Sequence, residues 1–75
     1  MLNYAQVQSI AEGETAEQLI DRFGEPGERL ETDGEIRALG YAAENPYGEV
    51  QELRIGFGDD GKVVRWTLAP RNRSK

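Results

Sequence analysis

The chain is 75 residues long, 37% hydrophobic and 31% charged, and it contains no cysteine and no histidine. This composition is typical of one small globular domain, and it excludes disulfides, cysteine–histidine metal sites and imidazole bases. Positions 1–70 carry fourteen acidic and six basic residues, a formal charge of −8, whereas positions 71–75 carry +3. Because an acidic body repels phosphate, we expect no direct binding to nucleic acid. No apolar run is long enough to cross a membrane, so we expect no membrane insertion.

Residues 3–12 predict a first short helix. Asn3 is a favourable N-cap, and Gln6 stands at the third helical position, as in a capping box. Gly13 would then end the helix. The apolar face of this helix would consist of Val7, Ile10 and Ala11.

The stretch GETAEQLIDRFGEP, residues 13–26, predicts a second helix with well-marked ends. Thr15 and Gln18 have the spacing of a capping box at its start. Gly24 provides a C-terminal stop, and Pro26 prevents continuation. The apolar face would consist of Leu19, Ile20 and Phe23.

After residue 26 the apolar period changes to two, which predicts strands. The candidate strands are ERLET, EIRALGYAA, EVQELRIGF and KVVRWTLA, separated by turn signals at Asp33-Gly34, NPYG and DDG. We therefore predict an α+β two-layer sandwich, with two N-terminal helices packed on one face of a three- to four-stranded antiparallel sheet. Residues 1–70 would form the single domain, and residues 71–75 a basic, flexible tail.

Pairing in the last hairpin follows if Asp60-Gly61 forms a two-residue turn. The apolar pairs on one sheet face would then be Phe57 with Val64, Ile55 with Trp66, and Leu53 with Leu68. A shift by one residue would destroy this match.

The preceding hairpin is consistent with two registers. A four-residue loop at 45–48 would place Ile36, Ala38 and Gly40 over the core. A five-residue loop or a bulge would instead place Leu39, Tyr41 and Ala43 there. We favour the second register because larger side chains fill a thin core better.

Three patterns that suggest chemistry have simpler interpretations. Residues 56–61 match G-x-G-x-x-G, but a strand rather than a helix follows, and two aspartates occupy the phosphate position. The sequence after Asp59-Asp60-Gly61 lacks the remaining ligands of a calcium loop. No spacing marks two carboxylates as a buried acid–base pair. We therefore expect no enzymatic activity, no metal and no cofactor.

Aromatic residues divide between core and surface. Trp66 is expected in the core opposite Ile55, whereas Tyr47, in the turn ENPYGE, has little core to enter. Tyrosine is frequent among residues that dominate protein interfaces. On the favoured register Arg54, Gly56, Arg65 and Thr67 line the open sheet face. The candidate protein-binding residues are therefore Asn45, Pro46, Tyr47, Arg54, Arg65 and Thr67.

Three segments in order, GETAEQLIDRFGEP, LGY (39–41) and LRIGFGDDGKVVRW, resemble the SmpA/OmlA (BamE-like) family. GETAEQLIDRFGEP fits the pattern G-x-T-x-x-x-[VL]-x-x-x-[LF]-G-x-P at Gly13, Thr15, Leu19, Phe23, Gly24 and Pro26. LRIGFGDDGKVVRW is similar to the family's penultimate hairpin, and LGY (39–41) stands where such domains carry an aromatic-rich strand. The resemblance spans roughly residues 7–68, and the layout is similar to that of β-lactamase inhibitory protein repeats. It implies a protein-binding module, a scaffold or an inhibitor, and we expect a bacterial or phage protein.

We therefore expect a small protein-binding module that acts through its open sheet face and hairpin tips. One alternative is an acidic cytosolic inhibitor of a nucleic-acid enzyme, of the phage anti-defence type, since the body charge is −8. Another is a structural homodimer that pairs edge strands or open faces. Without a signal peptide or lipidation cysteine the expected location is cytoplasmic; removal of a signal peptide would instead imply the periplasm or outer membrane.

Overall fold

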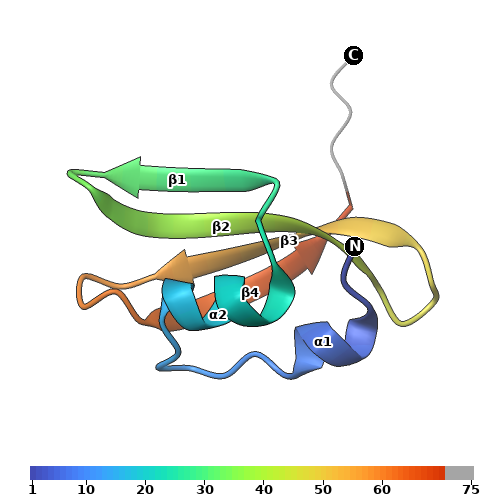
Figure 1. Ribbon diagram of the computed structural model, residues 1–75. Coiled ribbons are helices and arrows are strands. Elements are labelled where there is room, and N and C mark those ends of the chain that lie inside the picture. Colours follow the sequence, from blue (N-terminus) through green and yellow to red (C-terminus); the bar gives the residue numbers. More distant parts are fainter. Residues whose placement is uncertain (71–75) are drawn as a thin grey trace, which may run out of the picture.

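The computed structural model describes residues 1–70, in which two short helices precede a four-stranded sheet (Figure 1). The elements are α1 (Tyr4–Gln8), α2 (Ala16–Phe23), β1 (Glu28–Thr32), β2 (Glu35–Glu44), β3 (Val50–Phe57) and β4 (Val63–Ala69). The strands are antiparallel and lie in the order β1-β2-β3-β4, so each pairs with its neighbour in the sequence. The predicted α+β class is confirmed. The basic tail predicted at 71–75 lies outside the described residues.

The predicted helix caps are present. Thr15 Oγ1 accepts a hydrogen bond from the Gln18 N–H at 3.2 Å, and Gln18 Oε1 accepts one from the Thr15 N–H at 2.9 Å. Asn3 and Gln6 form the same capping box at α1. Helix α2 ends at Phe23, and its C-cap is Gly24, whose φ of 91° and ψ of −171° are essentially restricted to glycine. Local side-chain chemistry thus fixes where α2 begins and ends.

Helix α1 is shorter than the sequence indicates and ends at Gln8. The Ser9 hydroxyl donates a hydrogen bond to the carbonyl oxygen three residues earlier at 2.6 Å, which offers the backbone an alternative to another helical turn. The predicted helix stop at Gly13 is therefore wrong. The Gly13 N–H instead donates to the Val63 carbonyl at 3.1 Å, and Ala11, predicted on the apolar face, is exposed.

The β2–β3 hairpin adopts the favoured register. Glu44 pairs with Val50, which leaves a five-residue loop at 45–49. The side chains that this register buries are Leu39, Tyr41 and Ala43. Side-chain volume therefore distinguished correctly between the two registers.

The β3–β4 hairpin differs from the prediction at its turn. Two predicted pairs are confirmed, Leu53 with Leu68 and Ile55 with Trp66. However, Phe57 pairs with Val63, because β4 contains a bulge that adds Val64 as an extra residue. The Gly58 N–H donates to the Lys62 carbonyl at 2.9 Å and closes a longer turn. Val63 is therefore buried, and Val64 is half exposed.

Buried side chains from the two helices, the segments that flank them and one side of the strands form one apolar cluster. Its members are Leu2, Val7, Ile10, Ala16, Leu19, Leu39, Tyr41, Ala43, Leu53, Ile55, Phe57 and Val63. Trp66 packs against this cluster and is partly buried. The Tyr41 hydroxyl donates to the Gly24 carbonyl at 2.7 Å, and the Tyr41 ring meets that of Phe23 edge to face at 5.9 Å. Tyr41 thus ties the end of α2 to the middle of β2.

Candidate functional site

Three predicted contact residues share the sheet face opposite the buried side chains. Arg54 pairs with Thr67, Arg65 pairs with Gly56, and Arg54, Arg65 and Thr67 are exposed. Residues on this side alternate with the buried ones along each strand, as side chains do in a sheet. We call this surface the outer face and define it by Glu28, Leu30, Ala38, Gly40, Glu52, Arg54, Gly56, Arg65 and Thr67.

Arg54 lies at the centre of an ion-pair network on the outer face. Its Nη2 is 2.9 Å from Glu52 Oε2 and 3.3 Å from Glu28 Oε1. Gly40 separates the two glutamates, and a Cβ atom there would lie only 3.3 Å from Glu28 Cβ. The network therefore orients the guanidinium above a glycine. Because ion pairs at exposed positions contribute little stability, Arg54 can exchange its partners for a carboxylate of another molecule at low cost.

Arg65 is arranged differently. Its side chain lies over Gly56, where an added Cβ atom would be 3.7 Å from Arg65 Cγ. Its guanidinium forms no ion pair within residues 1–70. The outer face thus presents one guanidinium within a network and one that is available to a partner.

The loop at 45–49 is held by Asn45. The Asn45 Oδ1 accepts hydrogen bonds from the Tyr47 and Glu49 N–H groups, both at 2.9 Å, and its Nδ2 donates to Glu49 Oε1 at 3.2 Å. Asn45 is buried, whereas Pro46 is exposed and Tyr47 is 87% exposed. The structure therefore places Asn45 beneath the loop, with its amide occupied, and leaves Pro46 and Tyr47 as the accessible tip.

The predicted residues do not form one compact patch. Arg65 pairs with Gly56, which is six residues along β3 from Val50, the first residue after the loop. At a strand rise of about 3.3 Å per residue, Gly56 and Val50, and with them Arg65 and the loop, are roughly 20 Å apart. The candidate site therefore consists of two parts, the outer face around Arg54, Arg65 and Thr67, and the tip around Tyr47.

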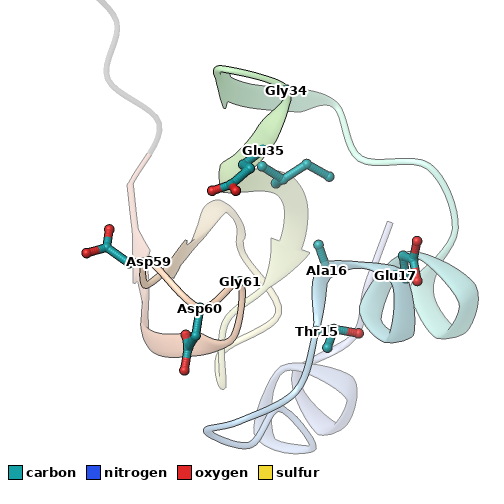
Figure 2. A pocket seen from close by; sticks show the side chains of 9 residues that line it. Thr15, Ala16, Glu17, Gly34, Glu35, Asp59, Asp60 and Gly61 are labelled. Carbon is teal, nitrogen blue, oxygen red and sulfur yellow. The ribbon is translucent and has the colours of Figure 1, made fainter.

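A separate cleft of about 340 Å³ lies between the start of α2 and the β1–β2 and β3–β4 turns. Its lining residues are Thr15, Ala16, Glu17, Gly34, Glu35, Ile36, Asp59, Asp60 and Gly61. Figure 2 shows that the carboxylates of Glu17, Glu35, Asp59 and Asp60 point in different directions. No group of acidic side chains in residues 1–70 is placed to hold a metal ion. Sequence reasoning missed this cleft because its three segments are distant in the chain.

Within residues 1–70 three groups have shifted pKa values, and each lies in a contact between segments. A hydrogen bond from Arg22 lowers the Glu14 pKa, and the same bond raises the Arg22 pKa. Burial raises the pKa of the Tyr41 hydroxyl. All three groups join α2 to neighbouring segments, and none of them lies on the outer face or at the tip.

Within residues 1–70 no helix has the length and apolar character needed to cross a membrane. Comparison with protein-family models, curated proteins and solved structures finds no match.

Proposed function

We propose that this chain is a small, non-enzymatic protein-binding module, a scaffold or an inhibitor, that contacts its partner through the outer face and the tip. The observation that carries this proposal is the placement of Arg54, Arg65 and Thr67 side by side on one exposed face of a largely acidic chain. Arginine is enriched among residues that dominate interfaces, because its planar guanidinium can bind carboxylates in two places at once. A partner with carboxylates or free carbonyl groups fits this face.

The proposal includes a two-layer arrangement in which both helices cover one side of the sheet. The buried cluster contains residues of both helices and of the inner positions of β2 and β3, which supports this arrangement. The outer face is then free for a partner.

The tip is preorganised for binding. Asn45 fixes the backbone at Tyr47 and Glu49, so little conformational entropy of the loop remains to be lost on association. A tyrosine side chain adds a large contact area with only two rotatable bonds. Tyr47 is therefore the aromatic anchor of the proposed interface.

We also propose that the chain has the SmpA/OmlA-like layout. The hydrogen bond from Tyr41 to Gly24 joins FGEP and LGY, two of the segments that carry the resemblance. Such a contact gives both segments an architectural role, which supports placing the binding function elsewhere, on the outer face and the tip.

Site-specific photocrosslinking in cells tests the surface assignment. A photoreactive amino acid is placed at Thr67 on the outer face, at Tyr47 on the tip, or at Gln8, an exposed position on α1 that serves as the control. We expect one protein to crosslink from the first two positions and not from Gln8. Equal crosslinking from Gln8, or none from Thr67, would overturn the assignment.

One observation favours a second candidate, an acidic inhibitor of a nucleic-acid enzyme. Glu17, Glu35, Asp59 and Asp60 line the cleft. Arg37 pairs with Glu35 at 3.6 Å and with Asp59 at 3.1 Å, so these five side chains together still carry a negative charge. A basic nucleic-acid site would be attracted to this cleft, and its binding should weaken steeply as salt increases. Affinity for such an enzyme that does not change between low and high salt would rule out this candidate.

A further inference from the structure

Strand β1 is a free edge of the sheet. It pairs only with β2, and all five of its residues are exposed. Within residues 1–70, no backbone group outside β2 hydrogen bonds to positions 28–32. Figure 1 shows β1 at the margin of the sheet, beyond both helices. An edge of this kind presents unpaired N–H and C=O groups to another strand.

The opposite edge, β4, is partly occupied. The Gly13 N–H donates to the Val63 carbonyl at 3.1 Å, and the Val63 N–H donates to the Glu14 carbonyl at 2.8 Å. The bulge at Val64 further distorts the start of that strand. In the β1–β2 pair, by contrast, the residue that pairing skips is Arg37 of β2, so β1 itself is regular. Strand β1 is therefore the better edge for adding a strand.

The charges of β1 fit a second copy of the same strand. In an antiparallel pair centred on Leu30, Arg29 of each copy lies opposite Glu31 of the other, and Glu28 lies opposite Thr32. Opposite charges at facing positions stabilise a strand pair. Leu30, which is 58% exposed, lies opposite its own copy and loses exposed apolar surface.

Other centres of symmetry are unfavourable. Centres at Glu28, Arg29 or Glu31 place a charged side chain opposite its own copy. A centre at Thr32 places Glu31 opposite Asp33. Since facing like charges destabilise a strand pair, the Leu30 centre is the register that the charge pattern selects.

We propose that the chain forms a homodimer by antiparallel pairing of two β1 strands about Leu30. The two sheets then join into one continuous sheet with both outer faces on the same side. The pair involves five residues of each copy, compared with roughly 20–30 residues per side in a standard interface, so the dimer is weak and depends on concentration. Glu28 and Leu30 belong to both surfaces, whereas Arg54, Arg65 and Thr67, which carry the outer-face proposal, lie on β3 and β4, outside the paired strands.

Charge exchange at positions 29 and 31 tests the register. Arg29→Glu or Glu31→Arg alone turns both facing ion pairs into like-charge pairs, and sedimentation velocity over a concentration series should show dimerisation weakened about tenfold or more. The double exchange restores opposite charges and should restore the dimer. Mixing the two single variants should produce a heterodimer. Far-UV circular dichroism and thermal unfolding confirm that each variant is folded.

Two results would overturn the proposal. One is a wild-type chain that remains monomeric at every concentration. This holds even if the monomer binds an extended peptide along β1. The other is a double exchange that dimerises no better than the single variants. None of these substitutions touches Arg54, Arg65 or Tyr47, so failure of the dimer is distinguishable from failure of the outer-face proposal.

Crosslinking provides an independent test, because the natural chain contains no cysteine. In the proposed dimer the Cα atoms of the two Leu30 residues lie about 4.5–5.5 Å apart, within the range of a disulfide. The two Thr32 residues are offset by four positions, or roughly 13 Å. Mild oxidation should therefore give a covalent dimer of Leu30→Cys and not of Thr32→Cys. Equal yields from both variants, or none from Leu30→Cys, would contradict the register.

Discussion

Replacing Tyr41 with phenylalanine removes one hydroxyl from the contact between α2 and β2. The hydroxyl donates to the Gly24 carbonyl at 2.7 Å, and the residue is only 5% exposed. The ring of the variant can keep its edge-to-face contact with Phe23 at 5.9 Å. The substitution therefore isolates the hydrogen bond from the packing around it.

The expected loss of unfolding free energy is about 1 kcal/mol. A hydrogen bond within a protein contributes roughly 0.5–1.5 kcal/mol net. Gly24 is an exposed residue, and if water hydrates its carbonyl in the variant, no further penalty for an unsatisfied buried group is added. In a domain of this size, 1 kcal/mol corresponds to a decrease of roughly 4–8 °C in Tm.

Thermal and urea unfolding followed by circular dichroism measure this loss. Tyr4→Phe is the matched control, because the Tyr4 hydroxyl makes no hydrogen bond within residues 1–70. Tyr41→Leu should lose roughly a further 0.5–1.5 kcal/mol, since it also removes the aromatic pair. If Tyr41→Phe is no less stable than Tyr4→Phe, the hydrogen bond does not hold α2 to the sheet.

The same residue predicts an alkaline limit to stability. Burial raises the Tyr41 pKa in the folded state, so its proton is held more tightly in the folded than in the unfolded chain. The associated stabilisation is present below the unfolded-state pKa of about 10, and it decreases as the pH rises through the folded-state value. Above pH 10 the unfolding free energy of Tyr41→Phe should therefore decrease less with pH than that of the wild type. Parallel curves for the two proteins would contradict this prediction.

Three further substitutions test individual contacts. Hydrogen bonds from Arg22 lower the Glu14 pKa, so their stabilisation is present above the unfolded-state pKa and is lost as the pH falls through the folded-state value. Glu14→Gln should therefore flatten the acidic part of the stability curve, and an unchanged acidic part would contradict it. Gly24→Ala should lower the unfolding free energy by about 1–3 kcal/mol, since the backbone conformation of Gly24 is restricted to glycine. An unchanged Tm would show that alanine is not strained at this position. Asn45→Ala should speed hydrogen exchange at the Tyr47 and Glu49 amides, and retained protection would show that the loop does not depend on Asn45.

Much of the architecture could be predicted because its determinants are local. Thr15, Gln18 and Gly24 mark the ends of α2 by capping chemistry, which needs no knowledge of the rest of the fold. The favoured β2–β3 register followed from side-chain volume, which identified Leu39 and Tyr41 as core residues. Prediction succeeded where a short stretch of sequence contains the whole physical cause.

Prediction failed where the cause lies in distant contacts. Val63 and Val64 are chemically identical, so no local signal indicates which of them enters the core. The choice accompanies pairing of residues 13–15 with Lys62 and Val63, in which the Gly13 N–H bonds to a strand rather than to a helix. The ion-pair network likewise depends on a distant contact. Arg54 bonds to Glu28, which is 26 residues earlier in the sequence. The alternation of side chains along β3 and β4 predicted that Arg54, Arg65 and Thr67 share one sheet face. No local pattern predicted that Asn45 is buried beneath the loop.

The most direct test of the outer-face proposal compares two charge-matched variants. Arg54→Gln with Arg65→Gln removes two positive charges from the outer face, and Arg37→Gln with Lys62→Gln removes two from described positions outside it. Affinity for the protein captured by crosslinking from Thr67 is then measured by isothermal titration calorimetry at fixed salt. We predict that the outer-face variant binds roughly tenfold or more weakly and that the control binds as the wild type does. Equal affinities of the two variants would contradict the proposal that this face binds the partner.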